Sequence, residues 1–228
     1  MKTIGIMVAM DKEMEQLRNL LEEQEVDKSG HLEFVKGRMA GHRIVLTRSG
    51  IGKVNAAIAA VELIRNYQPD LIVSSGCAGG TGPLMNVTDV VAADRIAYHD
   101  VYCGPENLSG QVQGMPAYFE TATDALQRLQ QLDLPVTLHV GTIVSGDWFV
   151  DSMEKMRDIF NQHPDAMAVD MESAAIAQTC YLYHKPFLSI RVISDLPLQE
   201  ERQEQYSGFW NKVADNSFTV IRQLIACL

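Results

Sequence analysis

The sequence lacks the patterns that mark disulfide-rich and metal-dependent proteins. Its 228 residues include four cysteines that lie far apart and form no Cys-x-x-Cys pair: Cys77, Cys103, Cys180 and Cys227. This spacing indicates reduced thiols rather than a disulfide framework or a zinc site. The six histidines are equally scattered. We therefore expect no metal and no other cofactor.

Long apolar runs and basic clusters are missing as well. No run is long enough to span a bilayer, and the short apolar start at 4–10 is followed at once by charged residues, which does not fit a signal peptide. The chain has 19 Lys and Arg against 29 Asp and Glu, a formal net charge of -10. This excess disfavours nucleic acid and anionic membranes as partners. The sequence predicts a cytoplasmic protein with a small-molecule ligand.

What is present is typical of a folded α/β protein. The composition, 46% hydrophobic and 21% charged, is that of ordinary globular chains, and the length favours a single domain over 1–228. Short β-type runs alternate with helical apolar spacing, which predicts a largely parallel, buried sheet with helices on both faces. The expected strands are 4–9, 44–49, 71–75, 90–98, 138–145, 167–170 and 187–194, and the expected helices are 14–21, 54–67, 153–162, 174–183 and 209–228.

Two other segments have recognisable patterns. Residues 32–39 and 43–47, joined around Gly41, are compatible with a hairpin. Residues 99–117 have no clear period and contain three glycines and two prolines, so they are expected to form a long loop. Loops of this length in compact domains usually serve a function or contact a partner.

Ligands in open α/β sheets bind beyond the carboxyl ends of the strands, so the residues after the expected strands are the candidate site. Five junctions qualify: 10–13, 49–53, 75–80, 145–149 and 191–195. The glycines around Ile51 allow backbone N–H groups to approach an anion. Position 55 is Asn, however, and Lys53 is followed by Val, so neither a dinucleotide fingerprint nor a phosphate loop is matched. A tight turn and a backbone contact to a ligand both stay open here.

Acidic residues follow two of the expected strands. Asp170 and Glu172 precede the helix at 174–183, where a carboxylate either caps the helix or acts in a site. For Glu172 we favour the site, and for Asp170 both interpretations stay open. Asp195 ends a strongly apolar strand, four residues after Arg191. A surface salt bridge between these two is the simple alternative, but an acid at a buried strand end is either paired or tuned towards the neutral form that a proton donor requires.

Seven segments carry a resemblance to a known family, and they extend over nearly the whole chain. They are Ile4-Gly5-Ile6 with Ala9-Met10-Asp11-Lys12-Glu13-Met14, Ser49-Gly50-Ile51-Gly52-Lys53-Val54-Asn55-Ala56, Gly76-Cys77-Ala78-Gly79-Gly80, Tyr98-His99-Asp100, Val144-Ser145-Gly146-Asp147, Val169-Asp170-Met171-Glu172 and Arg191-Val192-Ile193-Ser194-Asp195. In order and spacing the sequence resembles the nucleoside phosphorylase and nucleosidase superfamily, most closely the hydrolytic 5'-methylthioadenosine/S-adenosylhomocysteine nucleosidases. The resemblance implies a single three-layer αβα domain with a mixed, mostly parallel central sheet.

The resemblance also implies cleavage of a purine N-ribosidic bond, and it assigns roles to four residues. Asp195 would protonate adenine at N7. Glu13 would polarise the attacking water, with Arg191 holding the water and that carboxylate. Glu172 would bind the ribose hydroxyls. An acid on the leaving group and a base beside water on the opposite face is the inverting arrangement of glycoside cleavage.

The remaining nucleoside pocket is implied in the same way. Phe149 would stack on adenine, the backbone of Phe149 and Val150 would read its edge, and Met171 would pack against the sugar. The other implied binding residues are Met10, Ile51, Cys77, Ala78, Gly79, Asp170, Ser194, Pro197, Tyr206 and Phe209, with Tyr206 or Phe209 as the aromatic wall near the 5' substituent. A homodimer is implied as well, in which the 101–116 loop completes the partner subunit's 5' pocket.

Water is the expected nucleophile. Phosphorylases of the superfamily bind phosphate through arginines, one of which precedes the third junction, but this chain has Ser74 and Ser75 there. A phosphate dianion without a cationic clamp binds poorly. The alternatives are a phosphorylase of the same fold, a futalosine-type nucleosidase and a non-enzymatic nucleoside sensor, since one fold hosts several functions. The three carboxylates Glu13, Glu172 and Asp195 disfavour the sensor.

Three departures from the family pattern concern the pocket. Cys77 stands where the family usually has a hydroxyl residue near the water, and Asp170 is one methylene shorter than the usual glutamate. After Leu196-Pro197-Leu198 a polar stretch at 199–205 would line the region of the 5' substituent. The 5' group is therefore not specified by the sequence.

Overall fold

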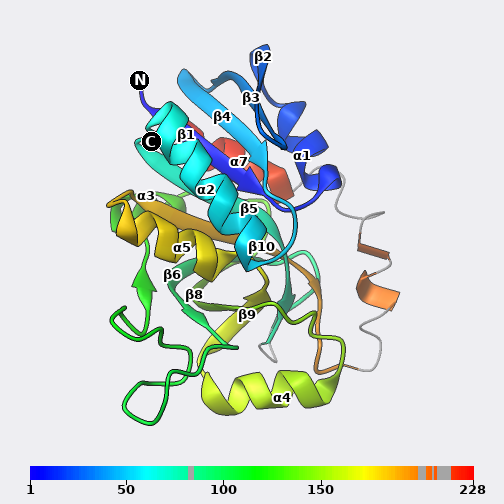
Figure 1. Cartoon of the computed structure of the whole chain (residues 1–228). Coiled ribbons are helices and arrows are strands. Elements are labelled where there is room, and N and C mark those ends of the chain that lie inside the picture. Colours follow the sequence, from blue (N-terminus) through cyan, green and yellow to red (C-terminus); the bar gives the residue numbers. More distant parts are fainter. Residues whose placement is uncertain (82–84, 200–203, 207, 210–216) are drawn as a thin grey trace.

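In the computed structural model, the described residues are 1–81, 85–199, 204–206, 208–209 and 217–228. Their ten strands form one mixed sheet with helices on both faces (Figure 1). The strands are β1 (Thr3–Val8), β2 (Glu22–Ser29), β3 (Leu32–Met39), β4 (His42–Arg48), β5 (Leu71–Gly80), β6 (Val90–Tyr98), β7 (Phe119–Glu120), β8 (Leu138–Ser145), β9 (Ala166–Asp170) and β10 (Phe187–Asp195). The helices are α1 (Asp11–Arg18), α2 (Lys53–Tyr67), α3 (Thr123–Gln130), α4 (Met153–Gln162), α5 (Ser173–Leu182) and α7 (Ser217–Ala226).

The sheet has a parallel centre and a closed end. Strands β4, β1, β5 and β10 lie in this order and are parallel. Because β5 also pairs with β9, and β10 also pairs with β6, the five strands β5, β10, β6, β8 and β9 form a ring. Antiparallel pairs come from β10–β6, β5–β9, β6–β7 and the β2–β3–β4 meander. The predicted mixed sheet is thus confirmed, and one continuous sheet is what the proposed single domain requires.

Side chains alternate between the two faces of the sheet and so divide the core. On β1, Ile4, Ile6 and Val8 pack into a cluster with α1, α3 and α7. Met7 points to the other face and belongs to a cluster with α2 and α5, which lie side by side in Figure 1. Both faces of β1 are therefore buried, as expected for a central parallel strand. The predicted three-layer arrangement is confirmed.

Most predicted elements are found, but three were missed. The β3–β4 hairpin is confirmed, and no helix or strand occurs at 99–117, as predicted. The predicted strand at 71–75 continues to Gly80 as β5, because its later residues pair with β10 and β9. Strands β2 and β7 and helix α3 were not predicted. β2 is rich in charged residues and lies at the edge of the sheet, so it carries no apolar pattern to recognise.

The C-terminal helix was predicted at 209–228. Helix α7 covers Ser217–Ala226 of this range, and 210–216 lie outside the described residues. None of the described helices combines the length and apolar character that a membrane crossing needs.

Candidate active site

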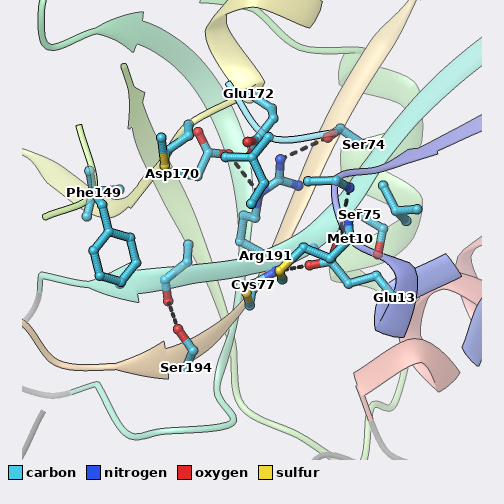
Figure 2. A pocket seen from close by; sticks show the side chains of 18 of the residues that line it. Met10, Glu13, Ser74, Ser75, Cys77, Phe149, Asp170, Glu172, Arg191 and Ser194 are labelled. Atoms are coloured by element: carbon cyan, nitrogen blue, oxygen red, sulfur yellow. Dashed lines mark hydrogen bonds and ion pairs between the residues drawn. The ribbon is translucent and has the colours of Figure 1, made fainter. Parts of the chain in front are cut away.

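One cavity at the carboxyl edge of the sheet collects residues from six strands (Figure 2). Its walls come from the segments that follow β1, β4, β8 and β9, and from the ends of β5 and β10. Phe149 and Glu13 lie on opposite sides of this view. Of the residues predicted to form the site, those that line the cavity are Met10, Glu13, Ile51, Cys77, Ala78, Gly79, Phe149, Val150, Asp170, Met171, Glu172, Arg191, Ser194, Asp195, Pro197 and Tyr206.

The carboxylate of Glu13 is fixed by backbone donors. Its Oε2 accepts hydrogen bonds from the N–H groups of Ala9 (3.0 Å) and Met10 (2.9 Å), and its Oε1 accepts one from Cys77 N–H (3.1 Å). Glu13 is 1% exposed. Burial raises the pKa of its carboxyl, although the Met10 N–H and the charge of Arg191 oppose the shift. An oriented carboxyl whose pKa is shifted towards neutral suits proton exchange with water.

Glu172 immediately precedes α5 but does not cap it. Its Oε1 instead accepts a hydrogen bond from the N–H of Gly52, 2.9 Å away at the start of α2. Burial raises the pKa of Glu172 to about 7, with a further contribution from the charge of Asp170. The alternative that Glu172 caps α5 is therefore wrong. Its carboxylate lies at the N-terminus of α2 and lines the cavity.

Asp170 and Arg191 form a buried ion pair, with Arg191 Nε 2.7 Å from Asp170 Oδ2. Arg191 also donates from Nη2 to Ser74 Oγ at 2.9 Å, as Figure 2 shows. Asp170 accepts hydrogen bonds from the backbone N–H and the hydroxyl of Ser173, so it both assists the start of α5 and carries a charge partner. Asp170 thus assists the start of α5 and also lines the cavity.

This pairing bears on two statements about Arg191. The salt bridge with Asp195, which was the disfavoured alternative, does not form among the described residues, because the ion pair of Arg191 is with Asp170. The resemblance also implied that Arg191 holds the carboxylate of Glu13. Among the described residues, the side-chain hydrogen bonds of Arg191 go to Asp170, Ser74 and the Ile190 carbonyl, and its positive charge acts on Glu13 electrostatically.

Asp195 has a hydroxyl beside it, and two aromatic rings line the same cavity. The Ser194 hydroxyl lies 2.6 Å from Asp195 Oδ1 and 3.2 Å from the carbonyl oxygen of Ala78, and it can donate to either acceptor. Phe149 is 57% exposed and meets the Tyr206 ring edge-on, with centroids 5.9 Å apart. A flat ring therefore lines the cavity without being covered by the core.

Phe209 is a correction to the predicted site. It is 1% exposed and packs in the core cluster with β1, α1 and α7, so Tyr206 is the residue of the two that lines the cavity. Within the polar stretch predicted near the 5' group, 200–203 lie outside the described residues. Gln205 turns back to the chain, where its Oε1 accepts a hydrogen bond from Leu196 N–H at 2.9 Å.

Sequence reasoning missed Trp148 and the partner role of Ser74. Trp148 lines the cavity beside Phe149, and Ser74 anchors Arg191. A signal for Ser74 exists, because buried hydroxyls in an apolar strand need partners. Cys77 shows what its departure means chemically: burial raises the pKa of its thiol well above the ordinary value, and the charge of Glu13 adds to the shift. The thiol is therefore neutral.

This fold and this site define an enzyme of the phosphorylase superfamily, whose family model matches residues 3–226. A 5'-methylthioadenosine/S-adenosylhomocysteine nucleosidase of Staphylococcus aureus (strain MRSA252) is 38% identical over 228 residues, which are 99% of this chain and 100% of the relative. The chain belongs to this nucleosidase family.

Solved structures of the family agree with this assignment. The enzyme of Neisseria meningitidis in complex with methylthio-immucillin-A has a TM-score of 0.93 and 36% identity, with 100% of both chains covered. The enzyme of Colwellia psychrerythraea 34H in complex with adenine has a TM-score of 0.93 and 31% identity, with 100% of this chain and 96% of that chain covered. The nucleoside phosphorylase-like fold that the sequence predicted is confirmed.

The buried ion pair leads to a stability prediction. Asp170→Asn leaves the Arg191 cation buried without its partner, and we expect the free energy of unfolding to fall by about 3 kcal/mol in urea titrations. Asp165→Asn is the matched control. Asp165 pairs with Arg95 at the surface, where the side chains are 38% and 41% exposed, so its loss should cost under about 1 kcal/mol. Equal losses in the two variants would contradict the structural role given to Asp170.

Proposed function

We propose that the chain hydrolyses the N-ribosidic bond of 5'-methylthioadenosine and S-adenosylhomocysteine, and also that of 5'-deoxyadenosine, to adenine and the free sugar. The observation that carries this proposal is the convergence of Glu13, Glu172 and Asp195 on one cavity. Relatives of the same family have been solved with adenine and with methylthio-immucillin-A, which supports a purine nucleoside as the ligand.

Each carboxylate has a distinct proposed role. Asp195, which lies beside the Ser194 hydroxyl, donates a proton to adenine N7 so that the base leaves as a neutral molecule. Glu13 orients water and takes its proton. Glu172 accepts hydrogen bonds from the ribose hydroxyls and stabilises the positive charge that develops on the sugar. Phe149 stacks on the base, and Met171 packs against the ribose.

The site favours water over phosphate as the nucleophile because it offers no available cationic clamp among the described residues. Among the described residues that line the cavity, Arg191 is the cationic side chain, and its guanidinium is engaged by Asp170 and Ser74. A phosphate dianion needs an arginine clamp with donors to spare. A phosphorylase is therefore the weaker alternative, and a futalosine-type nucleosidase differs in the group at the 5' carbon.

The reaction is tested by product analysis in phosphate-free buffer. We expect purified protein to convert 5'-methylthioadenosine to free adenine and free methylthioribose, measured by liquid chromatography with mass detection. Futalosine, run in parallel, should be cleaved more slowly. A requirement for added phosphate, with a sugar 1-phosphate as the product, would overturn the hydrolase assignment.

Asp195→Asn is the control variant for this assay. It removes the proposed proton donor while keeping the size of the side chain, so adenine release should slow by about 100-fold or more, while 5'-methylthioadenosine still binds in calorimetry. Near-normal turnover by this variant would rule out Asp195 as the general acid.

The pKa of Glu172 predicts a pH dependence. In the proposed mechanism, ionised Glu172 accepts hydrogen bonds from the ribose hydroxyls. The value of kcat/KM should therefore rise with pH through the folded-state pKa of about 7, and Glu172→Gln should lose this rise. The effect on stability has the opposite sign. Folding raises this pKa from 4.5, so the contribution of Glu172 to the free energy of unfolding is present below pH 4.5 and is lost as the pH rises to about 7. A Glu172→Gln variant with an unchanged pH profile would contradict the role.

We also infer a homodimer in which the 101–116 loop completes the 5' pocket of the partner subunit. Ile51, Val54 and Ile58 form an exposed apolar stripe at the start of α2, and exposed apolar stripes commonly mark protein contacts. The loop itself exposes Tyr102 and Leu108. A cytoplasmic location is part of the same proposal and fits four cysteines that are all free thiols.

The dimer is tested by sedimentation. We expect the wild-type chain to sediment at twice its monomer mass at micromolar concentration, and Val54→Lys to shift the population towards monomer with loss of nucleosidase activity. Val26→Lys is the control, because Val26 is also an exposed valine but lies on the edge strand β2. A wild-type monomer with full activity would refute the shared pocket.

A further inference from the structure

Outside the cavity, Lys53, Asp100 and Asp147 form a cluster of charges that the proposed chemistry does not use. Lys53 Nζ lies 2.8 Å from Asp100 Oδ2 and 3.9 Å from Asp147 Oδ2. Asp100 Oδ2 also accepts a hydrogen bond from the backbone N–H of Asp147 at 2.8 Å. The Tyr98 ring lies against the lysine, with its centroid 5.5 Å from Nζ. The three residues come from segments that are far apart in the sequence.

The cluster meets the active site at the N-terminus of α2. The first N–H groups of a helix have no partner within the helix and are available to carboxylates. Here the N–H of Lys53 donates to Asp147 Oδ1 at 2.8 Å, and the preceding N–H, that of Gly52, donates to Glu172 Oε1 at 2.9 Å. Two successive amides are therefore held by two carboxylates, one from the cluster and one from the cavity.

The geometry of Gly52 makes this coupling tight. Its φ is +94°, a conformation that other residues rarely adopt, and a Cβ placed there would lie 3.0 Å from Asp147 Oδ1. A residue with a side chain would therefore be strained at position 52 and would crowd Asp147, so glycine lets the turn place its N–H beside Glu172 while Asp147 approaches closely. Asp147 is followed directly by Trp148 and Phe149, which line the cavity. The cluster therefore connects Glu172, the proposed ribose-binding carboxylate, to the segment that carries Phe149, which is proposed to stack on the base.

We propose that Lys53, Asp100 and Asp147 are positioning residues that hold the Gly52 amide against Glu172 and fix this carboxylate relative to Phe149. The proposal rests on the proposed function, because it takes Glu172 as the group that binds the ribose. Asp100 anchors both other members, Asp147 holds the start of α2, and Lys53 neutralises part of their charge. None of the three needs to touch the nucleoside.

The first test is the carboxyl titration of Glu172, followed by NMR without substrate. In Asp147→Ala the Lys53 N–H loses its acceptor and the start of α2 is no longer held, so the hydrogen bond from Gly52 N–H to Glu172 should weaken. The titration should then move to higher pH, because this donor stabilises the ionised form of Glu172. Asp147→Asn removes the charge but keeps an acceptor for Lys53 N–H, so it separates the loss of the contact from the loss of the charge and should stay close to wild type. The other groups that act on Glu172, which are Asp170, Arg191 and Glu13, are unchanged in both variants.

The second test is kinetic. Asp147→Ala and Asp100→Ala should lower kcat/KM for 5'-methylthioadenosine about 10-fold, through both KM and kcat, and neither should add to the loss already caused by Glu172→Gln. Asp27→Ala is the control. It removes the ion pair between Asp27 on β2 and Lys36 on β3, neither of which lines the cavity, and should change neither kcat nor KM.

The outcomes separate the two proposals. Variants that lose stability but keep the Glu172 titration and kcat/KM would show a purely structural cluster and overturn the inference. A wild-type protein that does not cleave the nucleoside would overturn the proposed function instead, and the titration would still decide whether the cluster positions Glu172.

Discussion

The buried ion pair between Asp170 and Arg191 is the constraint on which the rest of the site depends. Removing two charges from water is costly, and the cost is recovered only when the geometry is good and the remaining donors and acceptors are satisfied. Here Ser74 and Ser173 satisfy them, with Ser189 beside the Ser173 hydroxyl at 2.7 Å. The pair joins β5, β9, β10 and α5, and it thereby sets the position of Glu172, two residues further along the chain.

Backbone N–H groups, rather than cations, hold the carboxylates of Glu13 and Glu172. Glu13 accepts three such bonds, and Glu172 accepts one from a helix N-terminus. Backbone donors orient a carboxylate without neutralising it, so the cavity keeps a concentration of negative charge with Arg191 as its counterweight. In the proposed reaction, this field would stabilise the positive charge that develops on the sugar more than it stabilises the neutral ground state. Burial raises the pKa of both carboxyls, and the backbone donors oppose this shift.

The sequence was informative wherever a residue is constrained by periodicity or by its place after a strand. The apolar runs predicted β1, β6, β8 and β10. The rule that ligands bind beyond the carboxyl ends of the strands predicted that Glu13, Glu172 and Asp195 lie at one edge of the sheet. Partner choice was not predictable, because the pairing of Arg191 with Asp170 depends on the register of β9 and β10 across β5. Phe209 was misassigned because aromatic residues line cores and cavities alike. Strand β2 was not predicted because an edge strand needs no apolar face and so carries no recognisable apolar pattern.

That edge strand has a consequence for how copies of the chain can meet. At one end of the sheet, β5, β10, β6, β8 and β9 close into a ring and leave little open backbone. At the other end, β2 presents its free edge with Glu22, Glu23, Glu25, Asp27 and Lys28, and a second β2 brought alongside would bring its own excess of acidic groups. Both ends of the sheet therefore disfavour pairing with a strand of a second molecule, which is how sheets extend from chain to chain into fibres.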